Sequence, residues 1–186
     1  MHYDISTLSD LDIYLFKEGK HTKLYEKLGA HTMQYEGSPG VYFAVWAPNA
    51  HSVSVRGDFN DYAADTHPLQ LRADDSGIWE GFIENVEQGL TYKYHIISKY
   101  DNIIHDKSDP FAFFSEKPSK SASRIWNIDG YDWQDERWMK ARHNVNVQDA
   151  PISVYEMHNG SWKRKVEEDN RYLTYRELAE ELPAYI

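Results

Sequence analysis

The stretch FAVWAPNAHSVSVRGDFNDY, residues 43–62, decides the fold of the N-terminal part of this chain. Apolar side chains recur in it at every second position, first at Phe43 and Val45 and then at Val53 and Val55. Alternation with a period of two is typical of strands that place one face on a core, and the intervening APNA is typical of a turn. The stretch therefore predicts two consecutive antiparallel strands joined by a tight connection.

The same period continues on both sides of that stretch. Further alternating segments are VYFAVWA (41–47), LQLRA (69–73), IWEGFIE (78–84) and YKYHIIS (92–98). The segments SPG, ADDSG, EQG and YDN between them are rich in turn-forming residues. Short strands at this spacing predict a mainly β fold, an immunoglobulin-like antiparallel β-sandwich that spans residues 31–110.

The segments next to the sandwich follow other patterns. Residues 1–30 predict a short helical lead-in, in which Ser9 caps a helix through DLDIYLFK and Gly19 follows its end. Residues 111–150 are rich in aromatic and charged residues but have little periodicity. This composition predicts a connection that wraps against its neighbours, because a disordered linker contains fewer Trp and Phe residues.

Residues 151–186 predict one strand followed by one helix. The apolar segment PISVYEMHNGSW is typical of a buried strand, and Thr174 with Glu177 three residues later is a capping box that begins a helix. A single strand–helix unit cannot bury its own apolar face, so we expect one incomplete βα unit of a truncated (β/α)8 barrel. The helix should then expose an apolar stripe through which the chain associates with itself; its members are Leu178, Leu182 and Ile186.

Composition excludes several classes of function. The formal net charge is −10, which disfavours nucleic acid as a partner, and the absence of cysteine excludes disulfides and thiolate metal sites. His105 and Asp106 lack partners at metal-ligand spacing, and we find no glycine-rich nucleotide loop, so neither a metal nor a cofactor is predicted. The chain shows no signal peptide and no apolar run near the ~20 residues of a membrane span. We therefore expect a soluble, cytoplasmic protein.

Three segments resemble one family of enzymes. Residues 43–62, together with KSDPFAF at 107–113, resemble the carbohydrate-binding module family 48 sandwich that precedes branching and debranching enzymes. PISVYEMHNGSWKR, residues 151–164, resembles the first strand of the glycoside hydrolase family 13 barrel. YLTYRELAEELPAYI, residues 172–186, is similar to the first barrel helix of branching enzymes. The chain thus resembles the N-terminal part of a bacterial glycogen (1,4-α-glucan) branching enzyme.

The resemblance implies an activity for a longer parent protein. Branching enzymes cut an α-1,4 glucan with retention and pass the released segment to a 6-hydroxyl, using a carboxylate nucleophile and a second carboxylic acid. In this family those carboxylates lie on later barrel strands. The resemblance therefore implies no catalytic residue in this chain, which should be inactive alone, and it implies α-glucan and the remainder of the barrel as partners.

The resemblance also implies candidate carbohydrate-binding residues. Sugars bind to a flat aromatic ring beneath their C–H face, with polar groups nearby for their hydroxyls. Tyr62 stands where glycogen-binding modules of this family carry a stacking Trp, and Lys93 matches their lysine. Tyr100 and Asn102 lie in the region of a second stacking ring. The alternative is that the sandwich braces the barrel without binding sugar.

Two other functions stay open at this point. The chain could be a stand-alone glucan-binding or regulatory module, or the N-terminus of a debranching or trehalose-releasing hydrolase. Residues 151–186 argue against a free module, which has no use for a barrel strand and helix. The segments Gly160-Ser161-Trp162 and YRELAEEL favour a branching enzyme over the hydrolases.

Overall fold

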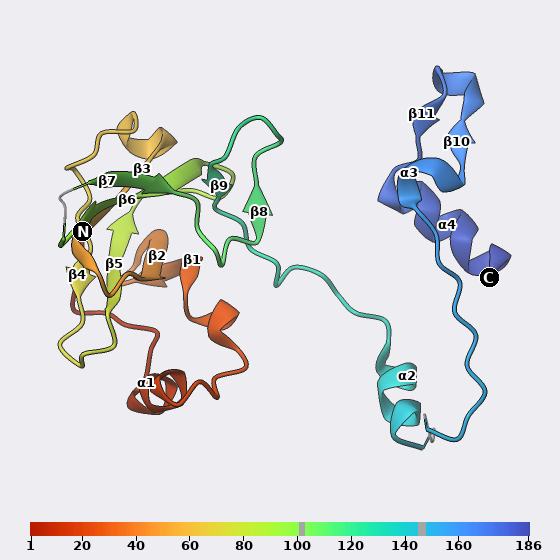
Figure 1. The fold of residues 1–186 in the computed structure, drawn as a ribbon, viewed down its shortest axis with the longest axis horizontal. Coiled ribbons are helices and arrows are strands. Elements are labelled where there is room, and N and C mark those ends of the chain that lie inside the picture. The colour runs from red at the N-terminus through yellow and green to blue at the C-terminus, as the bar shows by residue number, and fades with distance from the viewer. Residues whose placement is uncertain (101–102, 145–147) are drawn as a thin grey trace. The chain divides into compact units, whose positions relative to one another are not determined.

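The computed structural model describes residues 1–100, 103–144 and 148–186. Within these ranges the chain divides into two compact units, Met1–Tyr131 and Asp132–Ile186. The first unit is built of β-strands with a short helical segment, and the second consists of short helices and a small hairpin (Figure 1).

Two antiparallel sheets form the first unit. The first sheet has the order β1-β2-β5-β4, with β1 (Gly29–Tyr35), β2 (Ser38–Trp46), β5 (Ile78–Glu84) and β4 (Gln70–Leu71). The second has the order β3-β6-β9-β8, with β7 also on β6: β3 (Ala50–Gly57), β6 (Thr91–Ser98), β9 (Ser123–Arg124), β8 (Phe114–Ser115) and β7 (Ile104–Lys107). The antiparallel sandwich predicted from the period of two is confirmed. β8 and β9 lie beyond residue 110, where two-residue strands are too short to show a period.

Alternate residues of the facing strands fill the core between the two sheets. Val41 and Phe43 of β2 pack with Val53 and Val55 of β3, and each is at most 1% exposed. The ring of Phe43 meets that of Tyr92 on β6 edge to face, with centroids 5.2 Å apart. Complete burial stabilises each of these side chains by about 1.5–3 kcal/mol. Phe43, Val53 and Val55 are apolar positions that the alternation in residues 43–62 identified, and Val41 and Tyr92 belong to the neighbouring alternating segments.

The N-terminal segment covers the other face of the first sheet. Helix α1 (Asp10–Lys17) and the 3-10 turn η1 (Leu24–Glu26) bring Ile13 and Leu28 against Tyr42 of β2, and all three side chains are buried. β2 is therefore buried on both faces, in keeping with its apolar residues at consecutive positions.

The first nine residues are not helical. His2 forms an antiparallel bridge with Phe82 of β5, and each backbone N–H donates to the other's carbonyl over 2.9 Å. Ser9 then caps α1, because its Oγ accepts a hydrogen bond of 3.2 Å from the N–H of Asp12. The start of the chain thus extends an edge of the first sheet before it turns into the helix.

The carboxylate of Asp109 lies inside the sandwich. Asp109 is 7% exposed and accepts hydrogen bonds from the hydroxyls of Tyr92 (2.5 Å) and Tyr94 (3.1 Å) and from the N–H of Phe111 (2.8 Å). Its own N–H donates to Ser123 Oγ over 2.8 Å. Burial raises the pKa of the Asp109 carboxyl, although the hydrogen bonds that it accepts oppose this effect. The network joins β6 to β9 and to the segment between β7 and β8.

The second unit contains short elements and one longer helix. They are α2 (Glu136–Ala141), η3 (Arg142–Asn144), α3 (Asn159–Trp162), β10 (Arg164–Lys165), η4 (Val166–Glu168), β11 (Arg171–Tyr172) and α4 (Tyr175–Tyr185). The predicted capping box at the start of α4 is confirmed. Thr174 Oγ1 accepts from the N–H of Glu177 over 3.3 Å, and the Glu177 carboxylate accepts from the N–H of Thr174 over 2.8 Å.

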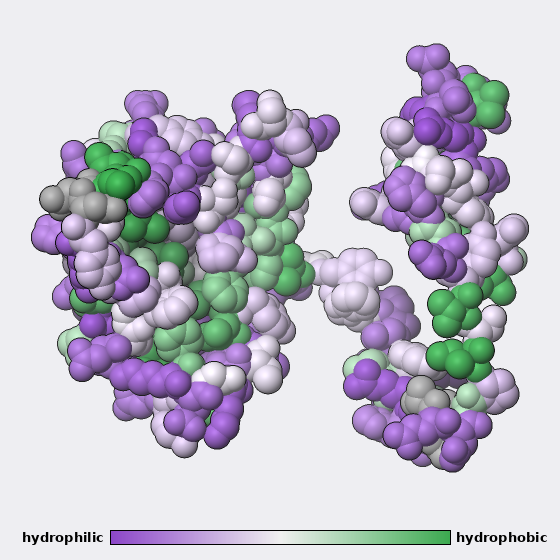
Figure 2. Space-filling model, in the orientation of Figure 1, coloured by the Kyte–Doolittle hydropathy of each residue, from purple (hydrophilic) through white to green (hydrophobic). Residues whose placement is uncertain are grey.

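The strand predicted at the start of residues 151–186 is wrong. The segment before α3 has no regular secondary structure, and Ile152 and Val154 are 79% and 81% exposed. Figure 2 shows hydrophobic residues at the surface of the second unit. A strand needs a neighbour to accept and donate its backbone hydrogen bonds. Within the described part of the chain this segment has no such neighbour, so the expected βα unit does not form here.

The apolar stripe expected on α4 is also narrower than predicted. Leu178 is only 6% exposed, and it is buried within the second unit together with Leu173, at 8%. Leu182 is half-buried, whereas Ile186 is 74% exposed. The turn before the helix covers part of the stripe, which leaves less apolar surface for self-association.

The Asp109→Ala substitution tests the buried network. It leaves the hydroxyl of Tyr92 without its acceptor, and it leaves the hydroxyl of Tyr94 only the carbonyls of Gly29 and Ala44, each 3.5 Å away. A buried polar group without a partner costs about 1–3 kcal/mol. We expect the free energy of unfolding in urea to fall by at least about 2 kcal/mol. The exposed Asp129→Ala is the matched control and should change it by less than about 0.5 kcal/mol. Overlapping unfolding curves for Asp109→Ala and the wild type would contradict the assignment.

Candidate functional site

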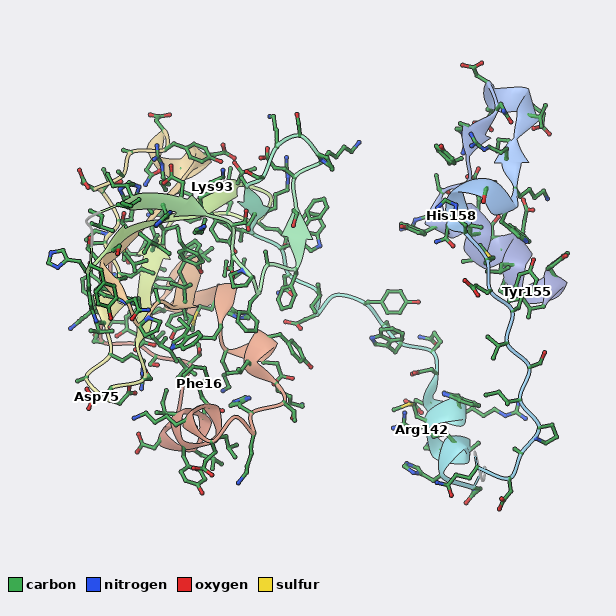
Figure 3. The ribbon with its side chains drawn as sticks, viewed as in Figure 1. Phe16, Asp75, Lys93, Arg142, Tyr155 and His158 are labelled. Atoms are coloured by element: carbon green, nitrogen blue, oxygen red, sulfur yellow. The ribbon has the colours of Figure 1, made fainter. Side chains whose placement is uncertain are left out.

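The outer face of the second sheet carries polar side chains from three strands. Arg56 of β3 lies directly across from Lys93 of β6, and His95 of β6 lies across from Asp106 of β7. Alternate residues of a strand share a face, so these four side chains lie together on the side away from the core. Lys93 is labelled on this sheet in Figure 3. We call this surface the outer face.

Charges on the outer face are paired. Arg56 Nη1 lies 3.0 Å from Asp106 Oδ2, and His95 Nδ1 lies 2.8 Å from Asp106 Oδ1. Partial burial raises the pKa of Asp106, but the hydrogen bond from His95 and the charge of Arg56 outweigh it, so the pKa lies below its usual value. Lys93 Nζ donates to Ser121 Oγ over 2.9 Å. The outer face therefore offers hydrogen-bond donors and acceptors without a large excess of either charge.

Tyr62 reaches this face from the loop after β3. Asp61 and Tyr62 both have positive φ angles, 51° and 57°, which cost of order 1 kcal/mol or more for a residue with a side chain. Asn60 offsets this cost, because its Oδ1 accepts from the N–H of Gly57 over 2.8 Å and its Nδ2 donates to the carbonyl of Val55 over 3.0 Å. The Asn60 side chain thus helps to hold the loop closed against β3, together with the hydrogen bond of 2.9 Å from the N–H of Tyr62 to the carbonyl of Gly57.

The ring of Tyr62 is fixed in place by two further contacts. Its hydroxyl is hydrogen-bonded to Thr91 Oγ1, which in turn donates to Asp58 over 2.9 Å. The guanidinium of Arg56 lies 5.8 Å from the ring centroid, within the range of a cation–π contact. The ring is half-buried, so part of it remains open to a ligand.

The structure brings some of the predicted binding residues together and separates others. Tyr62 contacts Arg56, which lies across from Lys93, so Tyr62 and Lys93 lie at the same end of the outer face. Tyr100 is 80% exposed but follows the far end of β6, about 20 Å along the strand from the end that Tyr62 contacts. Asn102 lies outside the described residues.

Three outer-face residues were not foreseen from the sequence: Arg56, His95 and Asp106. The period of two could have placed two of them on this face. In SVSVRGD, Arg56 alternates with the core residues of β3, and in YKYHIIS, His95 lies on the same face as Lys93. The pairing of β7 with β6, which adds Asp106, depends on register between strands and is not visible in either segment alone.

Other kinds of site find little support in the described ranges. No cluster of three or more metal-ligating side chains occurs among the described residues. Each helix in that part of the chain is too short or too polar to cross a membrane. In the second unit, His158 precedes α3, and its Nδ1 lies 3.1 Å from Ser161 Oγ, which is a local structural contact (Figure 3).

Similarity to known proteins covers the sandwich and continues into the second unit. Residues 27–112 match the family model of carbohydrate-binding module 48 (isoamylase N-terminal domain). The chain is 52% identical over 181 residues to the 1,4-alpha-glucan branching enzyme GlgB of Aquifex aeolicus, covering 97% of this chain and 28% of that protein. The resemblance to branching enzymes is confirmed.

A second branching enzyme gives a similar match. The branching enzyme GlgB of Albidiferax ferrireducens is 52% identical over 178 residues, which cover 96% of this chain and 27% of the relative. The chain therefore spans about a quarter of the length of the curated relatives that it matches. A Klebsiella pneumoniae pullulanase crystallised with maltotriose is 25% identical, covers 54% of this chain and 10% of its own, and has a TM-score of 0.44.

The Asn60→Ala substitution tests how Tyr62 is positioned. It removes the side-chain hydrogen bonds from Asn60 to Gly57 and Val55, so we expect amides between residues 58 and 66 to exchange hydrogen about tenfold faster, corresponding to about 1.4 kcal/mol of lost local stability. Hydrogen exchange measured by NMR reports this directly. Asp65→Ala, an exposed change in the same loop, is the control and should leave the rates unchanged. Unaltered protection in Asn60→Ala would show that other contacts hold the loop.

Proposed function

We propose that this chain is the N-terminal, glucan-binding part of a 1,4-α-glucan branching enzyme. One observation carries the proposal: identity of 52% to branching enzymes covers 97% of the chain, so it extends through both compact units. A match limited to the sandwich would suit any protein with a module 48 domain. Continuation through the second unit supports the branching enzyme over a stand-alone module.

In this proposal the parent protein transfers glucan segments and the chain supplies substrate contacts. Retaining transfer requires one carboxylate as nucleophile and another as acid and base. The buried or paired carboxylates of the first unit serve the fold: Asp109 accepts from two tyrosine hydroxyls, and Asp106 pairs with Arg56 and His95. The catalytic pair would therefore come from the remainder of the parent.

The outer face has the features that a neutral sugar requires. The Tyr62 ring is held by its hydroxyl and by Arg56, so binding would cost little conformational entropy. Arg56, Lys93 and Asp106 supply donors and acceptors within reach of a sugar stacked on that ring. Because the charges are paired, a neutral ligand would lose little by displacing water there. Tyr100 would contact a different part of a long glucan chain.

The second unit suits a role at the start of the catalytic barrel. Ile152 and Val154 are exposed in an extended segment that lacks a strand partner within the described residues. Apolar residues exposed in this way call for a covering partner. In the proposal that partner is the remainder of the barrel, which would convert the segment into a paired strand. Self-association through α4 and a cytoplasmic location remain predictions.

Affinity electrophoresis in gels containing glycogen tests glucan binding. The wild-type chain should be retarded, and Tyr62→Ala should weaken the retardation about three- to tenfold, because a stacking ring contributes about 0.5–1.5 kcal/mol. Tyr14→Ala removes an aromatic ring from the surface of α1, where it is 58% exposed, and should migrate like the wild type. If glycogen does not retard the wild-type chain at all, the sandwich is a brace and does not bind glucan.

An assay of a longer protein that contains this chain and the whole barrel tests the parent activity. Incubation with amylose should increase α-1,6 linkages, measured by their anomeric proton signal, while the 186-residue chain alone should produce none. Loss of α-1,6 linkages from a branched glucan would instead identify a debranching hydrolase.

A further inference from the structure

A cavity lies at the β5 edge of the first sheet, where β4 and the N-terminal segment meet. It has a volume of about 180 Å³ and is lined by Tyr3, Gln70, Leu71, Arg72, Ala73 and Glu80. Two short segments pair in turn with this edge of β5: His2 bridges Phe82, and β4 pairs with Trp79 and Glu80. The lining residues come from both segments and from β5, so the cavity opens at their junction. None of its residues belongs to the outer face of the second sheet.

A fixed aromatic ring forms one wall of the cavity. Tyr3 is 41% exposed, and its hydroxyl donates to the carbonyl of Pro68 over 2.8 Å, which anchors the far end of the ring. Gly81 of β5 allows the ring to lie close to the sheet, because a Cβ there would come within 3.4 Å of Tyr3 Cε1 and 2.8 Å of Met1 Cε. Tyr3 is therefore a pre-positioned surface for the C–H face of a ligand.

Buried polar groups form another side of the cavity. Glu80 is 8% exposed; its Oε1 accepts from Arg72 Nη1 over 2.7 Å, and its Oε2 accepts from Ser6 Oγ over 2.8 Å and from the hydroxyl of Tyr42. These bonds fix the carboxylate, and so they fix the guanidinium beside it. Rigid, partly buried polar groups of this kind are typical of ligand sites.

Two polar side chains retain hydrogen-bonding capacity at the cavity. Arg72 uses Nε toward Asp74, at 2.7 Å, and Nη1 toward Glu80, while its Nη2 makes no hydrogen bond within the described residues. Gln70 lies directly across from Glu80, and its side-chain amide is likewise unbonded in that part of the chain. The cavity can thus donate from Arg72 and Gln70 and accept at Gln70.

The charge balance selects the ligand class. Arg72 is paired with both Glu80 and Asp74, so an anion would meet an excess of negative charge. A cation would compete with Arg72, because the carboxylates of Glu80 and Asp74 already pair with its guanidinium. A neutral polyhydroxy ligand meets neither obstacle, and it has both hydroxyls for the amide and guanidinium and a C–H face for Tyr3. The volume is below the ~300 Å³ of pockets for drug-sized ligands, which suits a single sugar ring.

We propose that this edge cavity binds one neutral hexose unit of an α-glucan chain. That the ligand is a glucan and not another neutral polyol rests on the proposed function. The Tyr3 ring, the paired charges and the cavity volume support a neutral polyol without it. The first sheet then holds one glucan contact and the outer face of the second sheet holds another, so a branched or long glucan would be held at two points.

NMR titration of the full chain with maltoheptaose tests the proposal. We expect the amides of residues 70–73 and Gly81 to shift on binding, in addition to those near Tyr62 and Lys93. Tyr3→Ala should weaken binding at the edge cavity about three- to tenfold, because it removes the stacking ring. It should leave the shifts near Tyr62 unchanged. Gln70→Ala, at an exposed position of β4, should also weaken it, and provides a second variant that does not disturb the N-terminal segment.

The outcomes separate this inference from the proposed function. Shifts near Tyr62 without shifts at residues 70–73 would overturn the edge cavity and leave glucan binding by the outer face intact. Shifts at residues 70–73 that persist unchanged in both Tyr3→Ala and Gln70→Ala would also overturn it. If maltoheptaose shifts neither region, glucan binding by the sandwich fails altogether, and the edge cavity fails with it.

Discussion

The burial of β2 on both faces is the constraint on which the first unit depends. Its residues from Gly40 to Val45 are all buried, and its two edges are hydrogen-bonded to β1 and β5. A strand in this position needs one layer on each side. The second sheet supplies the inner layer, and the segment before β1 supplies the outer one. That segment is therefore part of the fold, since without it Tyr42 and Phe82 would face water.

The same covering segment creates the edge cavity. To place α1 over β2, the chain first runs along the free edge of β5, where His2 pairs with Phe82 and Ser6 bonds to Glu80. β4 occupies only part of that edge. The two segments leave a gap between them, and the groups at the gap are polar because they join the layers. The path of the N-terminal segment along β5 therefore both covers the first sheet and forms the candidate binding cavity.

The second sheet packs its apolar side chains on one face, and its outer face carries polar residues. Arg56, Lys93, His95 and Asp106 do not contribute to the core, so the fold sets their positions without restricting their chemistry. Asn60 and Thr91 then hold Tyr62 at the edge of this group. A rigid scaffold with an adaptable polar face is a general arrangement for ligand binding. The inner face, with Asp109 between Tyr92 and Tyr94, supplies the rigidity.

The sequence by itself determined the elements whose signals are local. The alternation in residues 43–62 located β2 and β3, and the capping box at Thr174 located α4, because a helix satisfies its hydrogen bonds within its own segment. Tertiary structure decided the rest: the bridge from His2 to Phe82, the pairing of His95 with Asp106, and the edge cavity. Residues 151–158 show why. Their pattern is that of a strand, but a strand exists only when another segment accepts its hydrogen bonds, and no local pattern encodes that partner.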